Sequence, residues 1–499
     1  MRRWIALALC LAMLGCGCGL AETVQKAPDF IMEGFDGDSA NHTWETNLFF
    51  ARMQEKTGIS FQFNQSTEFE AWTERKRTLA EAEDLPDVLF KAALTTAETR
   101  DLYAKGILID LRPYLETYAP NLWSLLQSRE DWMKAVQMED GAIPALPNFN
   151  ALQNNDVMWI NTEWLSRVKA EKPATAEELT EVLRLFKTGD PNRNGKADEI
   201  PLSFISMWEL RFLAHAFGII DNDYYVTVKD GQVTSSLTSA ENRAFLTWLH
   251  QLWEENLIDH RGFSTADSLR QITDEKAAIT YGMFLSPSPL TVVPSAALSQ
   301  FETLEPLTYD GKQIYRDLTG DIIRGTFAIT RACKEPEKLV AWVDNLYTAE
   351  GSQLAQIGLE GEDFIWNDEG YWEWNADMET VANVILPGST IAEGGSAPGW
   401  TDTALQLKYA DRVTRENIEQ LAAYRKFMIL PYPMVCLNAE DEAKLAQLQG
   451  PLMRYAEDSM AQFVTGDLEM NDQNWNAFTQ KVSELGLSEV IGILQKYVK

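Results

Sequence analysis

Apolar residues recur along the chain with two different spacings, and these spacings predict strands that alternate with helices. Short apolar runs at Phe30 to Met32, Ile59 to Phe63 and Val88 to Phe90 are typical of buried strands, whereas Phe69 to Ala82 has its apolar residues at helical spacing. Strands that alternate with helices favour a parallel sheet that is covered by helices on both faces. The pattern therefore predicts an α/β fold.

One change of character divides this layout. Ile143 to Pro147 leads into a stretch rich in Asn, Phe149 to Asp156, where we expect the chain to cross into a second lobe. A chain of 499 residues is also too long for one ordinary core. A buried strand within Lys276 to Phe284 marks the expected return to the first lobe. The expected divisions are residues 22–150 for lobe 1, 151–275 for lobe 2, 276–330 for the return to lobe 1, and 331–499 mainly for lobe 2 and C-terminal helices.

Residues 1–21 have the three parts of a signal peptide. Arg2 and Arg3 form a basic start, Ile5 to Leu14 is apolar, and small residues precede the expected cleavage before Glu22. We therefore expect an exported protein, periplasmic or at the cell surface. The letters MLGC form an imperfect lipobox, so a lipid anchor at Cys16 is an open alternative.

The net charge and the cysteine content limit which partners and which disulfide bonds we expect. The chain has 74 acidic and 43 basic residues, a net charge of −31, which argues against a nucleic-acid partner. The acids are scattered, as on a solvated surface. Cleavage before Glu22 would leave Cys333 and Cys436, which either form a disulfide in an oxidising compartment or remain two buried thiols.

The loop TGDPNRNGKADEIP, residues 188–201, has oxygen-bearing residues at the spacing that surrounds a calcium ion. Asp190, Asn192, Asn194 and Asp198 occupy loop positions 1, 3, 5 and 9, Gly195 occupies the sharp turn at position 6, and Lys196 can offer its backbone carbonyl at position 7. Position 12 is Pro201 instead of the usual Glu, and the nearest carboxylate is Glu199. The alternative is an ordinary surface turn, because Asp, Asn and Gly also form turns.

Several blocks of the sequence, taken in order, resemble the family 1 extracellular solute-binding proteins, nearest to the large oligosaccharide-binding lipoprotein type. These blocks are LPDVLF, GILIDLRPYLETYAPNL from Gly106, WINTEWL from Trp159, the block PATAEELTEVLRLFKTGDPNRNGKADEIPL, and the tail from Phe463 through GDLEMNDQNWNAF. The resemblance implies two α/β lobes joined by several crossings, which close on a sugar and deliver it to an ABC transporter permease. It also implies a structural calcium ion whose shell Glu199 completes. We expect a monomer.

Sugar binders combine aromatic platforms with planar polar side chains. Ligands of open α/β sheets bind at the loops that follow strands. The aromatic residues that we predict in such loops are Trp44, Trp208, Tyr281 and Trp400. The polar residues that we predict to meet hydroxyl groups are Asp36, Asp38, Asn41 and Asn150. Each of these polar residues also suits a turn or a helix cap.

Two other functions remain as alternatives. A secreted carbohydrate-active hydrolase needs only two suitably spaced carboxylates, and an acidic chain offers such pairs by chance. Against it, the four His residues form no HExxH pair, and no GxSxG elbow or phosphate-binding loop is present in the sequence. A sugar sensor or adhesin without transport would share the fold and the ligand site.

Overall fold

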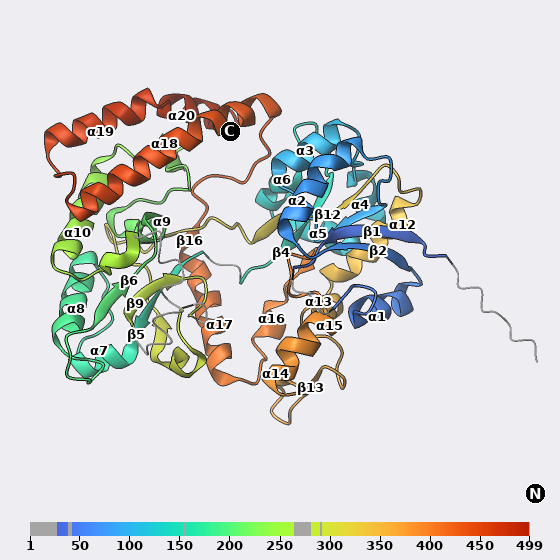
Figure 1. Ribbon diagram of the computed structural model, residues 1–499, viewed down its shortest axis with the longest axis horizontal. Helices are drawn as coiled ribbons and strands as arrows, with labels where there is room; N and C mark the ends of the chain where they lie inside the picture. Colours follow the sequence, from blue (N-terminus) through green and yellow to red (C-terminus); the bar gives the residue numbers. More distant parts are fainter. Residues whose placement is uncertain (1–26, 38–41, 153–154, 264–280, 290–291, 499) are drawn as a thin grey trace, which may run out of the picture.

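Two lobes, each with its own sheet, lie side by side (Figure 1). The computed structural model describes residues 27–37, 42–152, 155–263, 281–289 and 292–498. The expected leader with Cys16 and the predicted ligand residues Asp38 and Asn41 lie outside these ranges. The α/β expectation and the two-lobed organisation are confirmed.

Lobe 1 is built on a six-stranded sheet in the order β15-β4-β12-β3-β1-β2. Its strands are β1 (Phe30–Phe35), β2 (Phe61–Ser66), β3 (Val88–Phe90), β4 (Ala145–Phe149), β12 (Ile322–Ile329) and β15 (Gly399–Trp400). Strand β12 alone runs antiparallel to its neighbours β3 and β4. Successive residues of a strand face opposite sides, so Val88 and Phe90 enter one core cluster and Leu89 enters another.

Helices cover both faces of this sheet, as the alternating pattern predicts. They are α1 (Leu48–Thr57), α2 (Phe69–Thr78), α3 (Thr96–Ala104), α4 (Arg112–Tyr118), α5 (Pro120–Ser128), α6 (Glu130–Val136), α12 (Pro336–Asp344), α13 (Ala349–Gln356) and α15 (Leu386–Ser389). A small hairpin, β13 (Phe364–Trp366) and β14 (Trp372–Trp374), packs with α14 (Met378–Thr380) and α16 (Thr403–Gln406) at the lower end of the lobe (Figure 1).

Lobe 2 has a four-stranded sheet in the order β10-β5-β9-β6. The strands are β5 (Val157–Asn161), β6 (Ile200–Ser203), β9 (Tyr281–Ser286) and β10 (Phe301–Thr303), and a hairpin of β7 (Val226–Lys229) and β8 (Gln232–Ser235) lies apart. Its helices are α7 (Thr162–Val168), α8 (Ala176–Thr188), α9 (Met207–Leu210), α10 (Ala240–Glu254), α17 (Arg412–Tyr424), α18 (Ala439–Thr465), α19 (Asp472–Glu484) and α20 (Leu487–Gln495). One large core cluster unites all of these elements.

Helix α8 shows how local sequence sets the framework of lobe 2. The Thr175 hydroxyl accepts from the backbone N–H of Glu178 at 3.2 Å, which caps the first turn. Leu179, Leu183 and Phe186 then fall on one face and are fully buried. The helix ends at Thr188, directly before the predicted calcium loop, so the loop starts from a fixed point.

The boundaries between the lobes differ from the expectation in two places. Strand β9 pairs with β5 and β6, so the chain is still in lobe 2 at Tyr281 and returns to lobe 1 only at Ile322. Residues 331–406, expected mainly in lobe 2, belong with lobe 1, because α12 and α13 enter its core and β15 pairs with β4. An apolar run predicts a buried strand but not the sheet in which it pairs.

In the part of the chain that the structure describes, three segments cross between the lobes: residues 150–152 with 155–156, residues 316–321, and residues 407–411. Two of the segments near the crossings form a short parallel pair, β11 (Tyr315–Arg316) with β16 (Met428–Ile429). Cys333 and Cys436 are both free thiols, so they do not form the disulfide that was one of the two alternatives.

No helix among the described residues is long and apolar enough to cross a membrane.

Candidate functional site

The edge of the lobe 1 sheet that faces lobe 2 is where its parallel strands end. Strands β1 and β3 are parallel, and β12 is antiparallel to both β3 and β4, so β1, β3 and β4 all end at one edge. The first crossing leaves from that edge at Asn150. Asp36 follows β1 there, and Trp400 ends β15 beside β4. The structure thus brings these three predicted residues to one edge, the place where open α/β sheets bind ligands.

A hollow of about 330 Å³ lies beside Trp400. Asn148, Asn150 and Trp400 line it together with the glycine-containing loop that precedes β15. The Asn148 amide donates to the backbone oxygen of Ala397 at 3.0 Å and ties this loop to β4. The loop can follow its path because Gly399 has a φ of 141°, which side chains disfavour. Trp400 is half-buried, so part of its ring is available at the hollow.

Trp44 and Asp36 differ from the expectation, because each is buried by the other and by their neighbours. Trp44 is 1% exposed, and its Nε1 donates to Asp36 Oδ2 at 2.8 Å. Its ring packs edge-on against Phe90 in the lobe 1 core. The Lys91 ammonium donates to the same Asp36 oxygen at 3.1 Å. Trp44 is therefore a core residue at the base of this edge, because core packing stabilises its apolar ring. Its buried ring offers no face on which a sugar could stack.

The prediction that Tyr281 lies in a loop after a strand is also wrong. It begins strand β9 instead of ending one, and β9 runs antiparallel to β5. Its backbone oxygen accepts from the Asn161 amide at the far end of β5, which places it at the edge away from lobe 1. The ring is 1% exposed within the lobe 2 core. Tyr281 therefore offers no surface to a ligand between the lobes.

Trp208 lies on the edge of lobe 2 that faces lobe 1. Strands β6 and β9 both run antiparallel to β5, and the first crossing enters β5 from lobe 1, so β6 ends at the facing edge. Trp208 comes in α9, shortly after β6, and is 36% exposed. Its Nε1 donates to Asp223 Oδ1 at 2.8 Å, and its ring meets Phe212 edge-on. This placement matches the predicted rim position.

The sequence reasoning missed a charged cluster behind Trp208. Arg316 is 2% exposed and donates to Asp221 at 3.4 Å and to Asp223 at 3.2 Å. Arg211, also buried, donates to Asp221 at 2.9 Å and stacks on the Tyr225 ring. Buried guanidinium groups require such partners. No sequence motif marks this cluster, since its members come from β11, η2 (Arg211–Phe217) and the turn before β7.

A second hollow, of about 310 Å³, lies between the lobes. Asp223 and Tyr224 line it from lobe 2, Thr96 and Arg324 line it from lobe 1, and the segment after β16 closes it. Nearby, the Asp156 carboxyl is buried in the first crossing. Burial raises its pKa to about 6, and Arg316 partly offsets this effect. The first crossing therefore contains a group that titrates near neutral pH.

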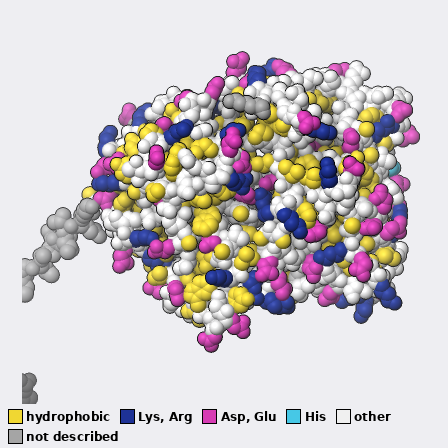
Figure 2. Space-filling view, turned by 180° about the vertical axis from the view of Figure 1, so that it is seen from behind, with side chains coloured by type: hydrophobic (Ala, Val, Ile, Leu, Met, Phe, Trp, Pro, Cys, Tyr) yellow, Lys and Arg dark blue, Asp and Glu magenta, His cyan; other side chains and the backbone are white. Residues whose placement is uncertain are grey.

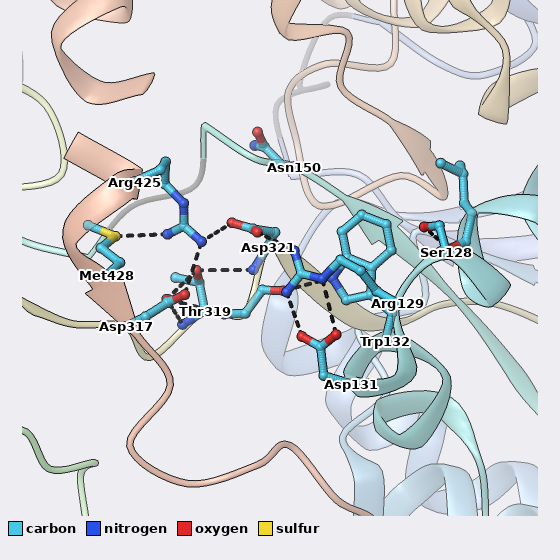
Figure 3. A network of polar contacts seen from close by, with 12 residues as sticks. Ser128, Arg129, Asp131, Trp132, Asn150, Asp317, Thr319, Asp321, Arg425 and Met428 are labelled. Carbon is cyan, nitrogen blue, oxygen red and sulfur yellow. Dashed lines mark hydrogen bonds and ion pairs between the residues drawn. The ribbon is translucent and has the colours of Figure 1, made fainter. Parts of the chain in front are cut away.

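The crossings are held by a polar network that centres on Asp321 (Figure 3). Arg129, between α5 and α6 of lobe 1, donates to Asp321 Oδ2 at 2.6 Å. Arg425, just after α17 of lobe 2, pairs with Asp321 Oδ1 and with Asp317 Oδ2. Trp132 donates its Nε1 to the Gly320 oxygen at 2.9 Å. Asp321 thus receives one arginine from each lobe.

The loop from Asp190 to Asp198 forms a turn that is closed by its own side chains. Asp190 Oδ1 accepts from the backbone N–H groups of Asn194 and Gly195, which closes the turn. Asn192 and Asn194 both donate their amide Nδ2 to Asp198 at 2.9 Å. These contacts hold the pKa of Asp198 below its usual range. Asp190, Asn192, Asn194 and Asp198 thus contribute side-chain oxygens to the loop, and Lys196 contributes a backbone oxygen. The loop bends at Gly195, where φ is 70°.

Glu199 is the part of the loop that fits a cation. It is 3% exposed, and among the described residues its Oε1 has no hydrogen-bond partner. Burial raises its pKa, and Asp198 and Asp190 add to that effect. Within the described residues, no three His, Cys, Asp or Glu side chains form a metal-binding group by themselves. The candidate donor set here combines carboxylate oxygens with Asn and backbone oxygens, all of which calcium accepts.

The outer surface agrees with the expectation of scattered charge. On the face shown in Figure 2, Asp and Glu side chains alternate with Lys and Arg over both lobes. The net charge of −31 is therefore spread and not gathered into one region of this face.

Comparison with known proteins agrees with this architecture. No protein-family profile matches the chain. The fructooligosaccharide ABC transporter substrate-binding protein FusA of Streptococcus pneumoniae is 26% identical over 484 residues, which cover 90% of this chain and 86% of FusA. A solved EF-hand mutant of FusA with fructo-nystose superposes with a TM-score of 0.72 at 24% identity, covering 94% of this chain and 98% of that one.

A second solved structure supports the same fold. The HMO-binding, ABC-transporter-associated solute-binding protein from Bifidobacterium longum infantis superposes with a TM-score of 0.78 at 20% identity, and covers 95% of this chain and 100% of its own. The similarity extends over both lobes and their crossings. The chain is therefore a homologue of the extracellular solute-binding proteins of ABC transporters, and it has their two-lobed fold.

Proposed function

We propose that this protein captures an oligosaccharide between its two lobes and delivers it to the permease of an ABC transporter. The observation that carries the proposal is the pair of facing sheet edges, which present Trp400 from lobe 1 and Trp208 from lobe 2. The relationship to a fructooligosaccharide-binding relative over 90% of the chain supports the same substrate class.

The geometry suggests how capture works. A sugar ring stacks its apolar face on an indole and meets planar polar groups at its edge. Trp400 with Asn148 and Asn150 offers this combination on lobe 1. A ligand that contacts both edges stabilises the closed arrangement by its differential affinity for that state. The permease would then recognise the sugar-bound protein by the relative position of its two lobes.

We also propose that the loop from Asp190 to Glu199 binds a structural calcium ion. Asp190, Asn192, Asn194, Lys196, Asp198 and Glu199 are the residues that would hold it. The unpartnered buried oxygen of Glu199 supports the proposal, as does the relative whose EF-hand was mutated. Calcium would supply a fixed positive charge that joins the end of α8 to the start of β6. No open position for chemistry is needed in that role.

The remaining aspects of the proposal concern location and assembly. Cleavage before Glu22 would release a free protein, whereas lipidation of Cys16 would anchor it to a membrane. Mass spectrometry of the mature N-terminus decides between them. We propose a monomer, because each lobe buries its own core within one chain. Size-exclusion chromatography with light scattering tests this.

Thermal unfolding against a panel of oligosaccharides tests the main proposal, because a ligand that binds only the folded state raises the melting temperature. Chromatography of each mixture after the assay detects cleavage products. A shift without products supports a binding protein. Release of shorter sugars would support the hydrolase instead, and the absence of any shift would contradict sugar capture. Coupled uptake with the cognate permease separates a transport receptor from a sensor.

A further inference from the structure

The Asp223 carboxylate is held by only one of its two oxygens. Trp208 Nε1 donates to Oδ1 at 2.8 Å, and Arg316 Nη2 donates to the same Oδ1 at 3.2 Å. The side chain is 54% exposed. Among the described residues, Oδ2 has no hydrogen-bond donor. One oxygen is thus fixed and the other is turned toward solvent.

One of the two donors that fix Asp223, Arg316, is itself held in place by its surroundings. Arg316 is almost fully buried, pairs with Asp221 and lies 4.3 Å above the Phe212 ring. A buried guanidinium keeps its partners, because an unpaired charge in the interior is costly. The turn that carries Asp223 is closed by Asn222, whose Oδ1 accepts from the backbone N–H groups of Tyr224 and Val226. Asp223 therefore needs no rearrangement to receive a ligand.

This carboxylate lies where a captured molecule would meet it. Asp223 lines the hollow between the lobes, opposite Thr96 and Arg324 of lobe 1. The partly exposed Trp208 ring is hydrogen-bonded to Asp223. An aromatic ring next to an oriented carboxylate matches a sugar ring, which has an apolar face and hydroxyl groups at its edge.

We infer that Asp223 and Trp208 form a sugar-ring subsite that selects neutral, hydroxyl-bearing rings over uronates. This inference rests on the proposed function. Three carboxylates, Asp223, Asp317 and Glu442, line the hollow, and one guanidinium, Arg324, does so. Asp317 is paired with Arg425 and Glu442 with Arg100, so these acids hold the nearby cations. A ligand carboxylate would meet Asp223 as a like charge, whereas a hydroxyl would donate to its Oδ2.

Isothermal titration calorimetry of the mature protein tests the inference. The ligands are three neutral trisaccharides (kestose, maltotriose and xylotriose) and trigalacturonate. We expect at least one neutral trisaccharide to bind and trigalacturonate not to bind. Asp223→Asn keeps the shape but loses the charge, so the affinity for the neutral ligand should fall by about tenfold or more.

Asp230→Asn is the matched control, because Asp230 is an exposed Asp in the turn between β7 and β8. Its affinity should equal that of the original protein. Melting temperatures show whether each variant is folded, and Asp223→Ser replaces Asp223→Asn if the latter is destabilised. Unchanged affinity of the Asp223 variant, or equally tight binding of trigalacturonate, would overturn the subsite while leaving sugar capture in place. Failure of all four ligands to bind would overturn both.

Discussion

Asn150 donates its backbone N–H to the backbone oxygen of Asp321 at 2.9 Å, so two of the three crossings are bonded to each other. The bond continues the antiparallel pairing of β4 with β12, in which Phe149 lies opposite Ile322. Asp321 has a φ of 62°, in the left-handed region that Asp tolerates better than most residues. Its carboxylate then joins Arg129 of lobe 1 to Arg425 of lobe 2.

Asp321→Asn should destabilise the protein by roughly 1.5–3 kcal/mol, because hydrogen bonds to charged groups contribute about that much and two arginines lose their shared partner. Asn tolerates the positive φ, so the backbone is preserved. Urea unfolding measures the change. Asp310→Asn, in an exposed turn with a φ of 48°, is the control and should change little. Equal losses in both variants would contradict the role of the network.

Asp190→Ala combined with Asp198→Ala should abolish stabilisation by calcium. The original protein should melt at a higher temperature in calcium than in chelator, since an ion that binds the folded state stabilises it. The double variant should melt at the same temperature in both. If the original protein shows no difference between calcium and chelator, the loop is an ordinary turn.

Trp400→Ala should weaken oligosaccharide binding by more than about 1 kcal/mol, because the ring supplies stacking area at the lobe 1 hollow. Titration calorimetry measures the dissociation constant. Trp374→Ala is a suitable control, since Trp374 belongs to the β13–β14 hairpin and packs on Trp372 instead of the hollow. An affinity unchanged by the loss of Trp400 would assign that ring a purely structural role.

Asp156 should make the protein less stable as the pH rises from about 4 to about 6. Its pKa in the folded protein is about 6, whereas an unfolded Asp has a pKa of about 3.9. In that window the folded state binds the proton and the unfolded state does not, so the free energy of unfolding falls as the pH increases. The whole loss is present above about pH 6.

Asp156→Asn cannot titrate, so its stability relative to the original protein should increase between pH 4.5 and pH 7.5. We expect a relative gain on the order of 1–3 kcal/mol. Urea unfolding of both proteins at the two pH values measures it, and the comparison cancels the titration of all other groups. A difference that does not vary with pH would contradict the burial of an ionised Asp156.

Local patterns predicted the elements of the fold better than their assembly. The strands near Phe30, Ile59 and Val88 and the helix that begins at Phe69 were predicted because the spacing of apolar residues is a property of short segments. Strand β9 was assigned to the wrong lobe, since its partners β5 and β6 are chosen by packing.

The same limit applies to the site. Asn150, Trp400 and Trp208 lie near strand ends, as the loop argument expects, although Trp400 is the last residue of β15 and Trp208 belongs to helix α9 instead of a loop. Trp44 and Tyr281 were mistaken for rim residues, since a tryptophan after a strand can equally fold back into the core. Asp223 could not be found from sequence, because the arginine that orients it is 93 residues away.

Strand β12 lies between β3 and β4 in the lobe 1 sheet, although the whole first part of lobe 2 separates it from them along the chain. A growing chain that ends near residue 150 has β3 and β4 but nothing to join them. These strands cannot be joined until Ile329 has been made, and the edge strand β15 follows only at Gly399–Trp400; long loops delay such pairing. The newly made N-terminal third should therefore remain unfolded, so that chaperones can bind it and it can be exported in an extended form. Both lobes should become stable together, late in folding.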